Sequence, residues 1–159
     1  MPYLLIFFPL LGSILGYSVK FLGDRYSEII TTTLVVISAI LSCFIFYNGA
    51  VHDLYGNYKI LDWISSGNLK VNWSINIDPL SSIMLVVVTS VSSLVHIYSI
   101  GYMSHDPNKP RFMSYLSLFT FSMLMLVVSD NFLQLFFGWE GVGLCSYLLI
   151  GFWYKKESA

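Results

Sequence analysis

Apolar runs separated by short polar segments make up most of the chain. A helix that crosses a bilayer needs about 20 predominantly apolar residues. Five runs approach or exceed that length, at residues 3–22, 29–47, 80–102, 112–128 and 131–154. The first run lacks the basic start and small-residue cleavage site of a signal peptide, so we expect it to be retained. The pattern predicts one membrane domain over residues 1–159, all-α in class, with about five transmembrane helices.

Residues 48–77, between the second and third runs, follow a different pattern. Apolar side chains alternate with polar ones over residues 69–77, which is the period of a half-buried strand. Residues 58–64 form a weaker strand candidate, and the turn-forming segment 65–68 separates the two. We predict a short extramembrane β-hairpin on one membrane surface, because its strand edges would lack hydrogen-bond partners in lipid.

Two local signals concern how the helices begin and pack. Asp78 followed by Pro79 is typical of a helix start, with Asp78 as the capping residue and proline at the first helical position. Gly12 and Gly16 are spaced as G-x-x-x-G, which permits a neighbouring helix to approach closely. Ordinary packing within a helical bundle explains that spacing without dimerisation.

Composition supports the membrane class and argues against several others. Hydrophobic residues form 56% of the chain and charged residues 11%, with a mean hydropathy of +0.71. A soluble domain carries about a quarter charged residues. The net charge of −1 gives no sign of nucleic-acid binding. Cys43 and Cys145 lie in apolar runs, without the spacing of a disulfide framework or a metal site.

Basic residues indicate how the helices are oriented. With five crossings, the two termini lie on opposite sides of the membrane. One side then holds six basic residues: Lys20, Arg25, Lys109, Arg111, Lys155 and Lys156. The other side holds Lys59 and Lys70. Because basic residues favour the inner side, we predict that the N-terminus is outside, the C-terminus is inside and the hairpin faces outside.

Glu140 is the one acidic residue in the last apolar run. The rise of an α-helix places it roughly 13 Å from Asn131, close to the middle of a hydrocarbon core about 30 Å thick. A charged, unpaired carboxylate is costly there, so it should face protein or water, and such residues often mark an ion or proton path. The alternative is a neutral, hydrogen-bonded glutamate that only ties helices together.

His96 is the one histidine inside a predicted span. Both a hydrogen-bonded packing role and a functional role are open for it. Haem ligation normally requires an axial ligand on a neighbouring helix as well. No second histidine lies inside a predicted span, which argues against a cytochrome. The sequence has no phosphate-binding loop, dinucleotide fingerprint, cysteine cluster or Ser-His-Asp pattern. It therefore predicts no catalytic residue, metal site or cofactor site in this chain.

Several ordered motifs point to one family. The shorter ones are DPLS at residues 78–81, LVHIYSIGYM at 94–103, RF at 111–112, YLSLF at 115–119 and SDN at 129–131. The longest is GWEGVGLCSYLLIGFW at residues 138–153, which contains Glu140. Together they resemble the N-terminal region of chain 5 (subunit L) of proton-pumping NADH–quinone oxidoreductase, respiratory complex I. The resemblance covers essentially the whole chain.

The resemblance implies the N-terminal portion of an antiporter-like membrane-arm subunit. In that family, the glutamate that matches Glu140 pairs with a lysine on a later helix, and protonation changes are coupled to electron transfer from NADH to quinone. We take Glu140 as the proton-translocating residue. The supporting candidates are His96, Asp78, Gly141 and Gly143.

The resemblance also implies which other subunits of the complex bind the cofactors and the substrates. NADH, FMN, iron–sulfur clusters and quinone would be bound by partner subunits. The partners of this chain would be other membrane-arm subunits, the remainder of the antiporter-like subunit and the lipid bilayer. The chain would lie in a bacterial cell inner membrane or a mitochondrial inner membrane, as part of a redox-driven translocase but without a redox site of its own.

Two further functions stay open. The large subunits of multi-subunit Na⁺/H⁺ antiporters share much of the longest motif, and a non-pumping structural or vestigial fragment would carry it as well. A low dielectric favours the neutral form of a carboxyl group, whereas a neighbouring ammonium favours the carboxylate. Since the later lysine is not in this sequence, we expect that this chain alone does not conduct protons.

Overall fold

The computed structural model describes residues 2–18, 24–52, 56–67, 69–102, 109–129 and 132–150. Five helices and two strands follow one another along the chain. They are α1 (Pro2–Ser18), α2 (Asp24–His52), β1 (Gly56–Ser66), β2 (Leu69–Ile77), α3 (Pro79–Tyr102), α4 (Lys109–Val127) and α5 (Phe132–Ile150). The ends of the first and last predicted spans, and the basic residues Lys20, Lys155 and Lys156, lie outside the described residues.

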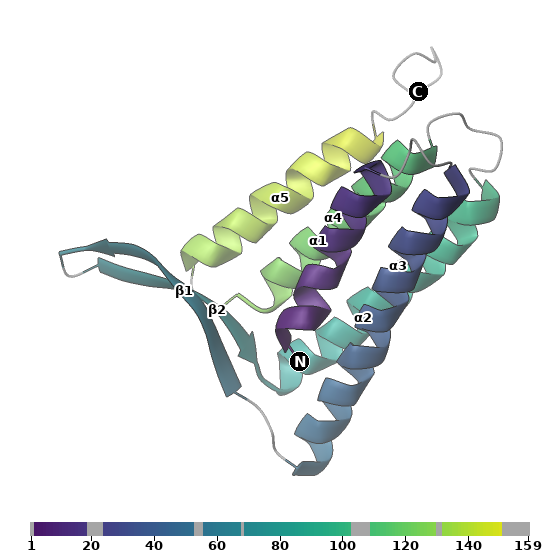
Figure 1. Cartoon of the computed structure of the whole chain (residues 1–159). Helices are drawn as coiled ribbons and strands as arrows, with labels where there is room; N and C mark the ends of the chain where they lie inside the picture. Colours follow the sequence, from purple (N-terminus) through teal and green to yellow (C-terminus); the bar gives the residue numbers. More distant parts are fainter. Residues whose placement is uncertain are drawn as a thin grey trace.

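The helices form a bundle in which sequence neighbours run in opposite directions (Figure 1). α1 packs against α2 and α4, α2 packs against α3, and α5 packs against α4. The start of α1 and the end of α5 lie at opposite ends of the bundle (Figure 1). We call the end where α2 and α4 begin and α3 ends the loop end, and the end next to the strands the hairpin end.

Three of the described helices are long and apolar enough to cross a membrane. These segments are Glu28–His52, Pro79–Tyr102 and Leu133–Ile150. Leu5–Ser18 and Arg111–Val127 are apolar but shorter. The predicted helical membrane class is therefore confirmed, whereas five crossings and their orientation stay predictions.

The segment between α2 and α3 contains two antiparallel strands. β1 pairs with β2 from Ser66↔Leu69 at the turn to Gly56↔Ile77 at the base, with register shifts between Lys59 and Leu61 and between Asp62 and Ile64. Gly67 adopts a φ of 58° in the turn, a conformation that glycine reaches without a steric penalty. The strands lie beside the end of the bundle where α3 begins (Figure 1).

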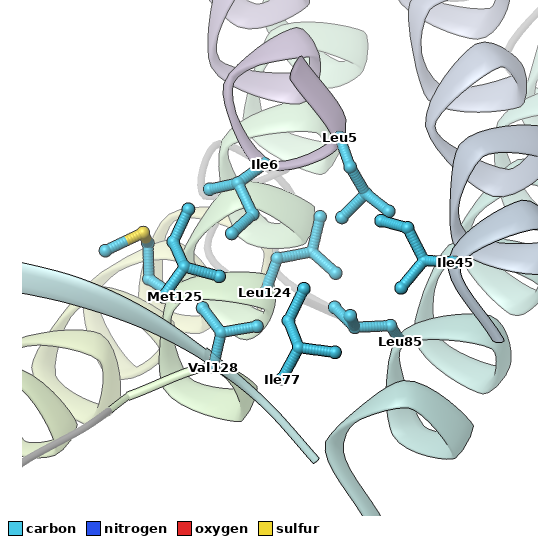
Figure 2. Close-up of a cluster of buried hydrophobic side chains, with 9 residues drawn as sticks. Leu5, Ile6, Ile45, Ile77, Leu85, Leu124, Met125 and Val128 are labelled. Atoms are coloured by element: carbon cyan, nitrogen blue, oxygen red, sulfur yellow. The ribbon is translucent and has the colours of Figure 1, made fainter. Parts of the chain in front are cut away.

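A cluster of buried apolar side chains joins the base of β2 to the bundle. Its members are Leu5, Ile6, Ile45, Ile75, Ile77, Leu85, Leu124, Met125 and Val128. Figure 2 shows side chains from α1, α2, β2, α3 and the end of α4 converging on one centre. The backbone N–H of Asn76 also donates to the carbonyl oxygen of Val128, over 2.9 Å. These contacts attach the base of the hairpin to the helices.

Candidate functional site

Glu140 lies almost at the centre of α5, eight residues after Phe132 and ten before Ile150. That is about 12 Å along the axis from the start of the helix. The side chain is exposed, and so are its helix neighbours Trp139, Leu144 and Tyr147. We call the exposed side of α5 that bears these residues the Glu140 face. The position of Glu140 near the middle of the helix agrees with the sequence, whereas its depth in a membrane stays a prediction. The described residues leave its side chain uncovered.

The opposite side of α5 packs closely on α4. A Cβ atom added at Gly138 would lie 2.9 Å from the backbone of Leu126, and one added at Gly141 would lie 2.9 Å from the Ser122 hydroxyl. Cys145 continues this side, with its sulfur 3.9 Å from the same hydroxyl. The absence of a side chain at Gly138 and Gly141 therefore lets the two helices approach, as small residues do in membrane bundles.

The two glycines named as supporting candidates have different surroundings. Gly141 is half-buried at the α4 contact, next to Ser122. Gly143 is exposed, and a Cβ there would meet nothing within 4 Å among the described residues. Gly141 thus contributes to helix packing, whereas Gly143 leaves open space near Glu140 on the helix surface.

Asp78 caps the start of α3. Its carboxylate oxygen Oδ1 accepts a hydrogen bond of 2.7 Å from the backbone N–H of Ser81. Its carbonyl oxygen accepts the N–H of Ser82 over 2.9 Å, as the first bond of the helix. This is the geometry of an N-cap residue. The contacts of Asp78 therefore show that it starts α3, at the hairpin end of the bundle.

His96 is fully buried in α3. Its Nδ1 atom lies 2.8 Å from the carbonyl oxygen of Ser92, which can only accept, so Nδ1 carries the proton of this hydrogen bond. In the neutral ring, Nε2 is then an unprotonated acceptor. No hydrogen-bond partner of Nε2 is found among the residues that the structure describes. Within the part of the chain that the structure describes, no hydrogen bond or ion pair joins His96 to Glu140, so the structure does not bring these two candidates together.

Buried hydroxyl groups link the helices, a feature that sequence reasoning missed. The Ser42 hydroxyl of α2 lies 2.7 Å from that of Thr89 in α3. Ser93 donates to the carbonyl oxygen of Val35 over 3.3 Å, and Ser38 donates to that of Leu5 over 2.9 Å. The spacing of Thr89, Ser93 and His96 by three or four residues was a readable signal, because it places these side chains on one face of a helix.

No metal site is formed within the described ranges, where no three His, Cys, Asp or Glu side chains are placed to hold an ion. The buried polar side chains of the described helices are mostly serine and threonine hydroxyls, together with those of Glu28, His96 and Gln134, while Glu140 is exposed on α5. All of these groups can form hydrogen bonds, and the imidazole and the two carboxyl groups can also take up and release a proton.

Two family models match the chain in sequence order. The first, described as NADH-Ubiquinone oxidoreductase (complex I), chain 5 N-terminus, matches residues 63–113. The second, described as NADH:quinone oxidoreductase/Mrp antiporter, TM, matches residues 129–159, which include Glu140. The two matches follow one another from the first hairpin strand to the last helix.

Curated relatives extend the similarity over almost the whole chain. NADH-quinone oxidoreductase subunit L of Rickettsia felis is 56% identical over 157 residues, which are 98% of this chain and 24% of that protein. NADH-ubiquinone oxidoreductase chain 5 of Arabidopsis thaliana is 55% identical over the same shares, and that of Phytophthora infestans is 52% identical over 156 residues. The chain spans about a quarter of the length of these relatives. By its sequence, the chain belongs to the subunit L/chain 5 family of NADH–quinone oxidoreductase, and it corresponds to an N-terminal part of that subunit.

Proposed function

We propose that this chain is the N-terminal portion of a membrane-arm subunit of NADH–quinone oxidoreductase, and that Glu140 carries protons through the membrane there. The observation that supports the proposal best is the place of Glu140, at the centre of an apolar helix and on a face that the described residues leave open. A carboxyl group at that depth is costly against lipid and belongs against protein or water.

The Glu140 face gives this residue its chemistry under the proposal. Further helices of the complete subunit cover the face and bring a basic side chain to Glu140. When the ammonium group is close, the carboxylate is favoured and the proton leaves. When it moves away, the low dielectric favours the neutral carboxyl group and a proton is taken up. Gly143 leaves room for water or another helix beside this group.

The partners follow from the same proposal. The chain assembles with other membrane-arm subunits and with the remainder of the antiporter-like subunit. Subunits outside this chain bind NADH, FMN, the iron–sulfur clusters and quinone. The five helices cross a bacterial or mitochondrial inner membrane, with the N-terminus outside and the C-terminus inside.

A pull-down tests the assembly. The tagged chain is extracted from membranes with a mild detergent, and all retained proteins are identified by mass spectrometry. Recovery of iron–sulfur and flavin subunits, together with a polypeptide that carries the later helices, is the expected result. Recovery of the chain without any such subunit would contradict the proposal and favour a non-pumping fragment.

One alternative has an observation in its favour. The family model that matches residues 129–159 is described as covering Mrp antiporters as well as NADH:quinone oxidoreductases. A Na⁺/H⁺ antiporter would use the same membrane glutamate without redox partners. Small antiporter subunits among the retained proteins, in place of iron–sulfur and flavin subunits, would select this alternative.

A further inference from the structure

Four of the buried polar side-chain atoms that lack a hydrogen-bond partner among the described residues come from three helices. They are the Thr32 hydroxyl of α2, Nε2 of His96 in α3, and the hydroxyls of Ser114 and Ser117 in α4. Buried polar atoms are nearly always hydrogen-bonded, to protein or to ordered water. Four such atoms in one bundle therefore need a common explanation.

Hydrogen bonds between the helices place these atoms at similar levels of the bundle. The Ser93 hydroxyl donates to the carbonyl oxygen of Val35, which sets these two residues at the same level. One turn nearer the loop end, His96 follows Ser93 in α3 and Thr32 precedes Val35 in α2. The Ser92 hydroxyl meets that of Thr120, and one turn further on come His96 and Ser117. Both steps lead towards the loop end, since α3 runs against α2 and α4.

The environment of Ser117 identifies where its hydroxyl lies. A Cβ atom added at Gly12 would come within 2.9 Å of the Ser117 hydroxyl and 3.6 Å of Cβ of Leu34. The hydroxyl therefore lies where α1, α2 and α4 meet, in the interior of the bundle. Ser117 is fully buried and Ser114 is 4% exposed, so neither is hydrated from the outer surface of the protein.

Other hydroxyl groups of the bundle behave differently. Thr31, Ser42, Ser82 and Thr120 donate to the carbonyl oxygen three or four residues earlier, over 2.7 to 3.2 Å. That local bond is available to almost any serine or threonine in a helix. Thr32, Ser114 and Ser117 do not make it, and their oxygens are free to bond to another group.

The chemistry of the four atoms fits water. Nε2 of His96 accepts a hydrogen bond because Nδ1 carries the ring proton, and each hydroxyl can both donate and accept. A buried water molecule typically makes two to four hydrogen bonds to groups of this kind. We propose that Thr32, His96, Ser114 and Ser117 form an internal water-binding site, in which water donates a hydrogen bond to Nε2 of His96.

The site has ionisable neighbours on two of the surrounding helices. Glu28 of α2, 7% exposed, lies one turn beyond Thr32 towards the loop end. Arg111 of α4, which is half-buried, lies about one turn beyond Ser114. If the proposed function holds, water here connects the interior of the bundle to the loop end by a route distinct from the Glu140 face. The water site itself does not depend on that function.

Solid-state NMR on the full chain in lipid bilayers tests the site. His52 and His105 are replaced by glutamine, so that His96 is the remaining histidine, and the histidine is labelled with ¹⁵N. The expected spectrum shows a protonated Nδ1 and an unprotonated Nε2 with a magnetisation-transfer peak from water. A protonated Nε2 with an unprotonated Nδ1, or an Nε2 without a water peak, would overturn the proposal.

A pair of matched variants connects the water peak to the hydroxyls. The double change Ser114→Ala and Ser117→Ala should reduce the water peak of Nε2 at least twofold. The control Ser82→Ala removes a hydroxyl that already bonds to the carbonyl oxygen of Pro79, and it should leave the peak unchanged. The Nδ1–H resonance reports whether His96 keeps its bond to Ser92 and so whether α3 is intact. An unchanged water peak in a double variant with an intact Nδ1–H resonance would refute the site. This measurement uses no partner subunit, so its result is independent of whether Glu140 transports protons. The water site and the proposed function can therefore fail separately.

Discussion

Gly138 of α5 lies against the backbone of Leu126 in α4, so closely that a Cβ atom at Gly138 would come within 2.9 Å of Leu126 Cα and its backbone nitrogen. A backbone contact cannot move aside as a flexible side chain can. The position of α5, and with it the direction of the Glu140 face, therefore depends on the lack of a side chain at residue 138.

Replacing Gly138 with alanine should loosen the contact between α4 and α5. Overpacking a close contact costs about 1–3 kcal/mol, and the cost should appear as a lower temperature of thermal unfolding in detergent. Gly143→Ala is the matched control, because a Cβ there meets nothing within 4 Å among the described residues. Equal stability of the two variants would show that the close approach of Gly138 is not required.

The cap of α3 gives a second prediction. Asp78→Ala removes the acceptor of the Ser81 N–H and should lower the free energy of unfolding by about 1 kcal/mol. Asp78→Asn keeps a side-chain oxygen at the same place and should retain most of that stability. Denaturant titration in detergent measures both variants. A loss of proton transport in Asp78→Asn with unchanged stability would instead assign Asp78 a role in function.

The Ser42–Thr89 hydrogen bond permits a double-mutant cycle. Ser42→Ala, Thr89→Ala and the double variant should show a favourable coupling of about 0.6 kcal/mol, the average for hydrogen bonds between membrane helices. The coupling should be near zero for the control pair Ser42 and Ser82, whose hydroxyls bond to separate carbonyl oxygens. Additive effects of Ser42→Ala and Thr89→Ala would mean that each hydroxyl acts only through its local carbonyl bond.

Hydrophobic pattern predicts the apolar part of each helix better than its ends. Residues 29–47 mark the apolar run of α2, yet the helix extends over Asp24–His52 because its polar ends keep helical backbone bonds. In the hairpin, alternation reveals β2, whereas β1 is weaker in pattern and extends to Gly56 through pairing with Ile77. Pairing between strands depends on tertiary structure, so it cannot be deduced from the alternation within one strand.

The candidate site shows the same division between what is local and what is tertiary. The position of Glu140 near the middle of α5 follows from counting residues, so the sequence predicts that position. The side of α5 that packs on α4 does not follow, since apolar residues surround the helix on every side and contacts with α4, such as Gly138–Leu126 and Gly141–Ser122, select one. The partnership of Ser42 with Thr89 likewise needs the register between α2 and α3.

Proton transport gives the last prediction. In the assembled complex, Glu140→Gln should abolish the proton flux that passes through this subunit, because the amide has a similar shape but cannot take up or release a proton. Tyr147→Phe, on the same exposed face of α5, removes a hydroxyl but no proton carrier of this kind and should leave the flux unchanged. The measurement is NADH-driven acidification of proteoliposomes, with quinone reduction followed in the same sample.

In liposomes that contain only this chain, no Glu140-dependent flux is expected, since none of its lysines falls within the apolar run that holds Glu140. Clear flux through the chain alone that Glu140→Gln abolishes would show that Glu140 works without a basic partner from another helix, and the exchange between its neutral and charged forms would then need a different cause.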